Sequence, residues 1–103
     1  MAPASDGKNA SMQGDSVRRR AIVHGRVQGV FFRDSVRERA NAHGVAGWVC
    51  NRSDGAVEAV LEGPEEAVLR VLRFMETGPP QAEVSGVQVA DEEPEGLSGF
   101  EIR

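Results

Sequence analysis

Apolar and polar positions repeat along the chain with two different periods, and the changes of period predict where strands and helices begin and end. Residues 17–24 have the composition of a strand that ends at His24, and residues 25–29 form a short loop with two glycines. Residues 32–43 follow a helical period, and Gly44 is placed to end that helix. One face of the helix is predicted to consist of Phe32, Val36, Ala40 and His43.

The middle of the chain predicts two strands joined by a tight turn. Residues 45–51 are strand-like and end at Asn51, and the pair Asp54-Gly55 is a strong hairpin signal. Residues 56–62 then alternate in polarity. Their apolar face is Val57, Ala59 and Leu61, and their opposite face carries Glu58 and Glu62. Trp48 is expected to pack in the core.

The last third of the chain predicts a second helix between two further strands. Pro64 suits a first helical turn, and the acids that follow it lie near the positive end of the helix dipole. Gly78-Pro79-Pro80 ends this helix. Residues 82–89 are predicted to be a strand, residues 91–96 an acidic loop and residues 100–103 a short closing strand.

This order of elements predicts an α+β fold of the ferredoxin-like type (βαββαβ). In such a fold, two helices cover one face of an antiparallel sheet, here of four to five strands. Residues 17–103 are predicted to form this one domain, because a chain of 103 residues suffices for a single core. Residues 1–16 are small, polar and aperiodic, so we expect a disordered N-terminal tail.

Charge and composition narrow the classes of function. The formal net charge is −4, whereas nucleic-acid binding depends on a basic surface, so no nucleic-acid partner is expected. The charge is uneven, however. Residues 17–52 hold eight arginines and two acids, and residues 53–103 hold three arginines and twelve acids. A small anion should therefore be attracted to the first part and repelled by the second.

Several further expectations follow from composition. One cysteine and two separated histidines do not supply a set of metal ligands, so no metal is expected. No stretch is long and apolar enough for a membrane span, and no secretory leader opens the chain. We therefore expect a cytoplasmic protein with no membrane partner. Without an apolar excess, it is expected to be a monomer.

The most informative stretch joins the first strand to the first helix. It reads Gly25-Arg26-Val27-Gln28-Gly29-Val30, followed by Phe31, Phe32 and Arg33. A two-glycine loop ahead of a helix N-terminus can turn backbone N–H groups toward one point and form a nest for a phosphate-sized anion. Arg33 lies in the first helical turn, where a cation is unfavourable unless an anion binds beside it. From these residues alone, a phosphate ligand and a solvated surface arginine remain equal alternatives for Arg33.

Two segments closely resemble the acylphosphatase family: HGRVQGVFFR at residues 24–33 and GWVCNRSDGAVE at residues 47–58. The resemblance covers roughly residues 18–103, including the closing GFEIR. Two long blocks in the right order are far more specific than a short motif. The resemblance implies the ferredoxin-like fold and the hydrolysis of acyl phosphates, which are mixed anhydrides, to a carboxylate and inorganic phosphate.

The resemblance also implies roles for individual residues. Backbone N–H groups of the loop from Gly25 to Val30 would hold the phosphate, Arg33 would bind its oxygens, and Asn51 would hold the attacking water. No cofactor is implied, because a carboxylate leaves without being protonated and the site acts through positioning and electrostatics. Some family members have a threonine after the asparagine, where this chain has Arg52. Either Ser53 orients Asn51 instead, or Arg52 adds positive charge near the substrate.

Two other classes of function fit part of the sequence. A non-catalytic module of the same fold would bind phosphate or carbamoyl phosphate without turnover, but it would not need a water-positioning amide at Asn51. A nucleic-acid or regulatory domain of ferredoxin-like fold is disfavoured by the acidic charge and by the scarcity of aromatic residues on the predicted sheet.

Overall fold

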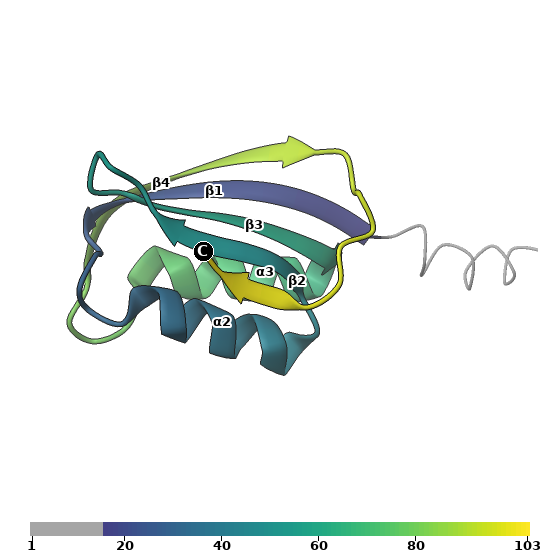
Figure 1. Cartoon of the computed structure of the whole chain (residues 1–103), viewed down its shortest axis with the longest axis horizontal. Coiled ribbons are helices and arrows are strands. Elements are labelled where there is room, and N and C mark those ends of the chain that lie inside the picture. Colours follow the sequence, from purple (N-terminus) through teal and green to yellow (C-terminus); the bar gives the residue numbers. More distant parts are fainter. Residues whose placement is uncertain (1–15) are drawn as a thin grey trace, which may run out of the picture.

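The computed structural model describes residues 16–103, which form two helices and five strands (Figure 1). Their bounds are β1 (Ser16–Arg26), α2 (Phe32–His43), β2 (Ala46–Asn51), β3 (Val57–Pro64), α3 (Glu65–Thr77), β4 (Glu83–Glu92) and β5 (Phe100–Ile102). The predicted order of elements is confirmed. The predicted tail lies outside the described residues except for Ser16, which begins β1.

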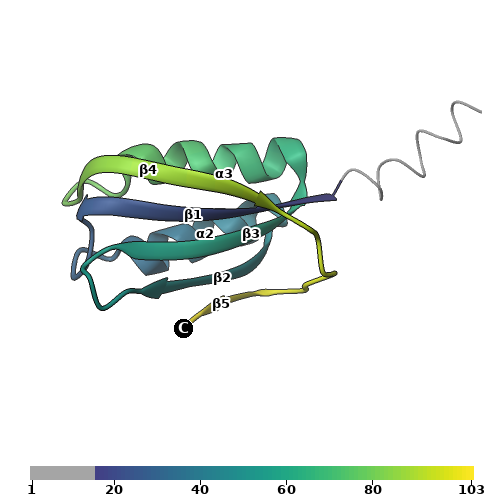
Figure 2. The same ribbon diagram turned by 90° about the horizontal axis from the view of Figure 1, so that it is seen from above.

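The strands lie side by side in the order β4-β1-β3-β2-β5 (Figure 2). β1 pairs antiparallel with both β4 and β3, and β2 pairs antiparallel with β3, as predicted. β5 pairs parallel with β2, so the sheet is mixed rather than wholly antiparallel. The reason is the return of the chain: after β4 it crosses the end of the sheet to the opposite edge and must then run back in the direction of β2.

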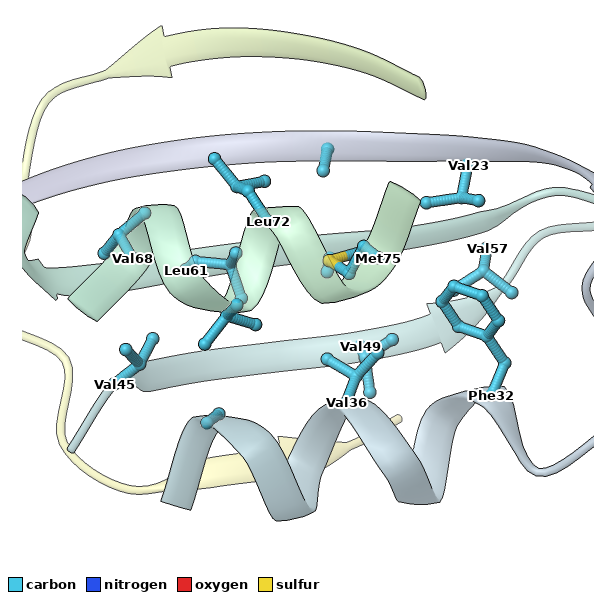
Figure 3. Packing of buried hydrophobic residues seen from close by; sticks show 14 of the residues in the cluster. Val23, Phe32, Val36, Val45, Val49, Val57, Leu61, Val68, Leu72 and Met75 are labelled. Carbon is cyan, nitrogen blue, oxygen red and sulfur yellow. The ribbon is translucent and has the colours of Figure 1, made fainter. Parts of the chain in front are cut away.

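Both helices pack on one face of the sheet, and the core lies between the two layers (Figures 1 and 3). Helix α2 buries Phe32, Val36 and Ala40, and its predicted fourth inward residue, His43, is exposed instead. Helix α3 buries one of its faces in the same core. The α3 residues of this face are Val68, Val71, Leu72 and Met75. Gly44 ends α2 in the left-handed conformation, as predicted.

Strands β1 and β4 both extend beyond their predicted ends. They pair from Arg18 opposite Glu92 to Arg26 opposite Glu83. Arg18 Nε donates a hydrogen bond to Glu92 Oε1 at 2.8 Å, so opposite charges on neighbouring strands support the ladder where the sequence is polar. The periodicity of one segment carries no information on such cross-strand pairs, so it does not predict where these strands end.

The outer face of the sheet carries a network of charges. Arg20 Nε donates to Glu92 Oε2 at 2.6 Å, and the same guanidinium contacts Glu58. Hydrogen bonds from Arg20 and then from Arg18 lower the pKa of Glu92. Acids from the second half of the chain therefore neutralise much of the basic run near residue 20. The attraction for anions that the sequence predicts for residues 17–52 is therefore expected mainly from the other arginines of that range.

Trp48 lies on this outer face and not in the core between the sheet and the helices, contrary to expectation. Its half-buried indole ring lies 5.5 Å from the guanidinium carbon of Arg20 and 4.9 Å from that of Arg103. Such stacking of guanidinium groups on an indole is favourable and covers its apolar surface.

Glu62 is on the face opposite Leu61, as the alternation predicts, but it is only 5% exposed. Its carboxylate accepts backbone N–H bonds from Glu95 (3.1 Å), Gly96 (2.6 Å) and Leu97 (3.1 Å). Burial is the largest single influence and acts to raise the pKa of Glu62, but these N–H groups and Arg18 outweigh it and lower the pKa. Glu62 thus anchors the acidic segment that crosses from β4 to β5.

Replacing Glu62 with glutamine is expected to destabilise the fold by about 1.5–3 kcal/mol, the worth of hydrogen bonds to a charged group. Because the folded-state pKa is lowered, the wild-type carboxylate stabilises the fold above its ordinary pKa of 4.5 and loses this contribution as the pH falls further. Urea unfolding at pH 7 and pH 4 measures both effects. Glu93→Gln, an exposed change on the same segment, is the control and should shift the midpoint little. Equal midpoints for Glu62→Gln and wild type at pH 7 would contradict this role.

Candidate active site

Strand β1 enters the site through a glycine that has no room for a side chain. The pairing of β1 with β4 shifts register between His24 and Gly25, and Gly25 has a φ of 122°. A Cβ atom there would lie 2.1 Å from the backbone oxygen of Glu83, so only glycine fits. Gly25 and Arg26 therefore belong to β1. The connecting loop begins at Val27, two residues later than predicted.

Two residues of this loop have left-handed backbone conformations: Gly29 with φ 75° and Phe31 with φ 62°. Phe31 is the only non-glycine residue of positive φ within residues 16–103, and this conformation costs such a residue about 1–2 kcal/mol. Phe31 immediately precedes α2, whose first N–H groups have no helical acceptors. A left-handed turn leading into free helical N–H groups is typical of an anion nest.

A pocket of about 230 Å³ lies between this loop, the start of α2 and the end of β2. Half-buried Arg33 and exposed Asn51 both line it, so the two predicted catalytic side chains share one cavity. Within the described part of the chain, neither side chain has a hydrogen-bond or ion-pair partner. Asp34 also lines the pocket, and its carboxylate lies 3.7 Å from Nη2 of Arg37. The remaining lining residues are Val27, Gly29, Phe31 and Phe32.

The predicted phosphate loop is thus only partly in the pocket. Val27 and Gly29 line it, whereas Gly25 and Arg26 lie in the strand that leads to it. Val30 lines a neighbouring recess on the other side of Phe31.

Gln28 has a side-chain role that sequence reasoning missed. Its Nε2 donates to the backbone oxygens of Arg52 (2.8 Å) and Ala56 (2.9 Å), in the turn between β2 and β3. Arg52 directly follows Asn51, so this amide connects the loop to the residue that presents the asparagine. The two-glycine loop predicts only a role for its backbone, and no local pattern indicates a side-chain partner more than twenty residues away.

Replacing Gln28 with leucine, which has similar size and no hydrogen-bonding groups, is expected to lower kcat about tenfold with a smaller change in KM. Without these hydrogen bonds, the loop and Asn51 would no longer be held in fixed relative positions, and small misplacements of catalytic groups lower the rate strongly. Steady-state kinetics with acetyl phosphate measures this split. Gln88→Leu is the matched control, since that glutamine contacts only His24 on the exposed sheet among the described residues. Unchanged kcat in Gln28→Leu would show that the two hydrogen bonds do not position Asn51.

Arg52 directs its side chain to acids of its own hairpin. Its guanidinium lies 3.1 Å from Asp54 Oδ2 and 3.4 Å from Glu58 Oε1. The hydrogen bond from Arg52, followed by the N–H of Ala56, lowers the pKa of Asp54. The positive charge of Arg52 is therefore largely offset, which weighs against its proposed contact with substrate. No hydrogen bond joins Ser53 to Asn51 in the described structure, so the other predicted alternative gains no support either.

Within residues 16–103, no cluster of three or more His, Cys, Asp or Glu side chains is arranged as a metal site. Neither described helix has the length and apolar character needed to cross a membrane.

The fold and the pocket together define a small α+β domain with a pocket at one end of its sheet that contains Arg33, Asp34 and Asn51. The family model named Acylphosphatase matches residues 19–102. An acylphosphatase of Rubrobacter xylanophilus is 58% identical over 86 residues, covering 82% of this chain and 77% of the relative. One of Haloquadratum walsbyi is 54% identical and covers 84% of this chain and 92% of the relative.

Solved structures agree with the sequence relatives. An acylphosphatase from Coxiella burnetii superposes with a TM-score of 0.85 at 38% identity, covering 89% of this chain and 97% of that structure. The chain belongs to the acylphosphatase family. The resemblance seen in the sequence is confirmed, and with it the class of reaction: the chain is an enzyme of the family that hydrolyses acyl phosphates.

Proposed function

We propose that the pocket formed by the loop, Arg33 and Asn51 is the catalytic site for this hydrolysis. The observation that carries the proposal is that Arg33 and Asn51 come from different elements, line one pocket and have no competing partners among the described residues. A guanidinium grips phosphate through parallel hydrogen bonds, and an amide can hold a water in a fixed orientation.

In this mechanism, the backbone N–H groups of the loop and Arg33 bind the non-bridging phosphate oxygens and stabilise the charge that develops on them. Asn51 orients a water on the side opposite the acyl oxygen. Attack forms the new P–O bond as the bond to the acyl oxygen breaks, and the carboxylate leaves with its electron pair. The water proton passes to the phosphate group itself, which yields carboxylate and dihydrogen phosphate.

The reaction requires neither a metal ion nor a cofactor in this scheme. A carboxylate is a good leaving group at neutral pH without protonation, and the charge that a metal would offset is offset by Arg33 and the backbone amides. This proposal rests on the chemistry of the substrate and on the donors that line the pocket.

We also propose a monomeric, cytoplasmic enzyme that does not bind nucleic acid. The net charge of −4 opposes nucleic-acid binding. The large exposed hydrophobic residues of the described chain lie in a loop, in α3 and in β4, and they do not indicate an apolar interface. They are Phe31, Leu69 and Val89. Size-exclusion chromatography and cell fractionation test these points.

The decisive experiment is hydrolysis of an acyl phosphate by chelator-treated protein, with wild type compared with Arg33→Ala and Asn51→Ala. Chelator-resistant turnover that both substitutions remove supports the proposed site. Folded wild-type protein that binds inorganic phosphate but shows no turnover would favour the non-catalytic binding module. Turnover lost on chelation and restored by a divalent metal would contradict the metal-free mechanism.

A further inference from the structure

Phe31 combines two features that packing does not explain. It is 71% exposed, although it is a large apolar side chain, and it has a left-handed backbone that is unfavourable for a bulky residue. Its neighbour Phe32 is buried in the core and accounts for the aromatic contact between α2 and α3. The proposed anion nest accounts for this backbone conformation, so the feature that points to a functional contact is the exposure of a large aromatic side chain beside the candidate active site.

Phe31 separates two cavities. On one side it lines the pocket that contains Arg33 and Asn51. On the other it lines a recess of about 310 Å³ that has no charged residue in its lining. The other residues of this recess are Val30, Ser35, Pro79, Pro80 and Gln81.

The geometry of phosphoryl transfer predicts on which side of the bound phosphate the acyl group lies. Attacking and leaving oxygens lie roughly in line on opposite sides of phosphorus. Asn51 ends β2, while Pro79 and Pro80 lie between α3 and β4. β1 lies between β4 on one side and β3 and β2 on the other (Figure 2). From this strand order, the loop that follows β1 is expected to lie between Asn51 and these prolines. A phosphate bound at this loop and attacked by a water that Asn51 holds would therefore direct its leaving acyl group toward β4, on the side of the recess.

We propose that the recess between Phe31 and Pro79–Pro80 binds the acyl group of the substrate and makes the enzyme selective for uncharged, apolar acyl groups of aromatic size. This inference rests on the proposed catalytic site. The recess offers an aromatic face and two proline rings, which lose little conformational entropy on binding. A second anionic group on the acyl chain would be desolvated there without a counter-ion in the lining.

The test compares kcat/KM for benzoyl phosphate and acetyl phosphate in wild type, Phe31→Ala and Pro80→Ala. Pro80 comes from a different segment than the phosphate loop, so its replacement leaves the nest itself unaltered. Both variants are expected to lower the benzoyl-to-acetyl ratio of kcat/KM, on the order of tenfold for Phe31→Ala, as expected for one apolar contact. The loss should appear mainly in KM for benzoyl phosphate, because an acyl contact is made in the ground state and the transition state alike.

Leu69→Ala is the matched control, because it removes an exposed apolar side chain elsewhere, on α3. It should leave kcat/KM unchanged for both substrates. An unchanged ratio in both Phe31→Ala and Pro80→Ala, with hydrolysis intact, would overturn the acyl site and leave the catalytic site standing. An equal loss for both substrates in Phe31→Ala, with Pro80→Ala like wild type, would likewise overturn it and limit Phe31 to shaping the loop. Wild-type protein that hydrolyses neither substrate would instead overturn the catalytic proposal on which the acyl site rests.

Discussion

Replacing Arg33 with alanine is expected to lower kcat/KM for acetyl phosphate by about 10- to 150-fold, with a higher KM and a lower kcat. The arginine is proposed to contact phosphate in the bound substrate and in the transition state. A charge-assisted hydrogen bond is worth about 1.5–3 kcal/mol, and about 1.4 kcal/mol corresponds to a factor of ten. Steady-state kinetics and inhibition by inorganic phosphate measure both changes.

Two further variants show whether the effect belongs to the guanidinium at this position. Arg33→Lys keeps the charge but loses the planar, two-pronged donor, and it should recover only part of the activity. Arg39→Ala removes a more exposed arginine of the same helix that lies over the ring of Phe74, and it should behave like wild type. Similar losses in Arg33→Ala and Arg39→Ala would mean that the substrate is bound by general positive charge on α2 and not by specific hydrogen bonds from Arg33.

Replacing Asn51 with alanine is expected to lower kcat by about 10²–10³ while KM changes little. The amide is proposed to position water, a function realised in the transition state, and loss of one positioned transition-state group has effects of this size. Because Asn51 is exposed at the end of β2, its removal should not affect stability, which thermal unfolding checks. Ser53→Ala, in the turn just after it, is the control. Undiminished turnover in Asn51→Ala would remove this residue from the mechanism.

The elements of the fold follow from local patterns, and the exceptions have identifiable physical causes. The bounds of α2 are those predicted, because an apolar stripe begins at Phe32 and Gly44 ends the helix. β4 is longer than predicted because Asp91 and Glu92, near its end, form ion pairs with arginines of β1. β1 continues past His24 because Gly25 and Arg26 still pair with β4 after a shift of register. The parallel pairing of β5 depends on the path of the chain across the sheet, which periodicity does not contain.

The candidate site likewise has residues that the sequence predicts and residues that it does not. The arginine and the asparagine were indicated by the resemblance, and the structure brings both into one pocket. The hydrogen bonds of Gln28 and the buried carboxylate of Glu62 were not foreseen, since each depends on backbone groups far along the chain. Residue type and spacing predicted which side chains are chemically useful. They did not predict which polar side chains hold the loops in place.

The direction of β1 has a practical consequence for attaching other proteins to this one. β1 begins at Ser16 and ends beside the pocket. Its 11 residues, at about 3.3 Å each, therefore separate Ser16 from the pocket. β5 runs parallel to β2 and therefore ends pointing toward the side where Asn51 lies (Figure 1). A fluorescent protein or surface linker joined ahead of Ser16 would be attached far from the pocket, whereas one joined after Arg103 would be attached near the end of β2 that carries Asn51.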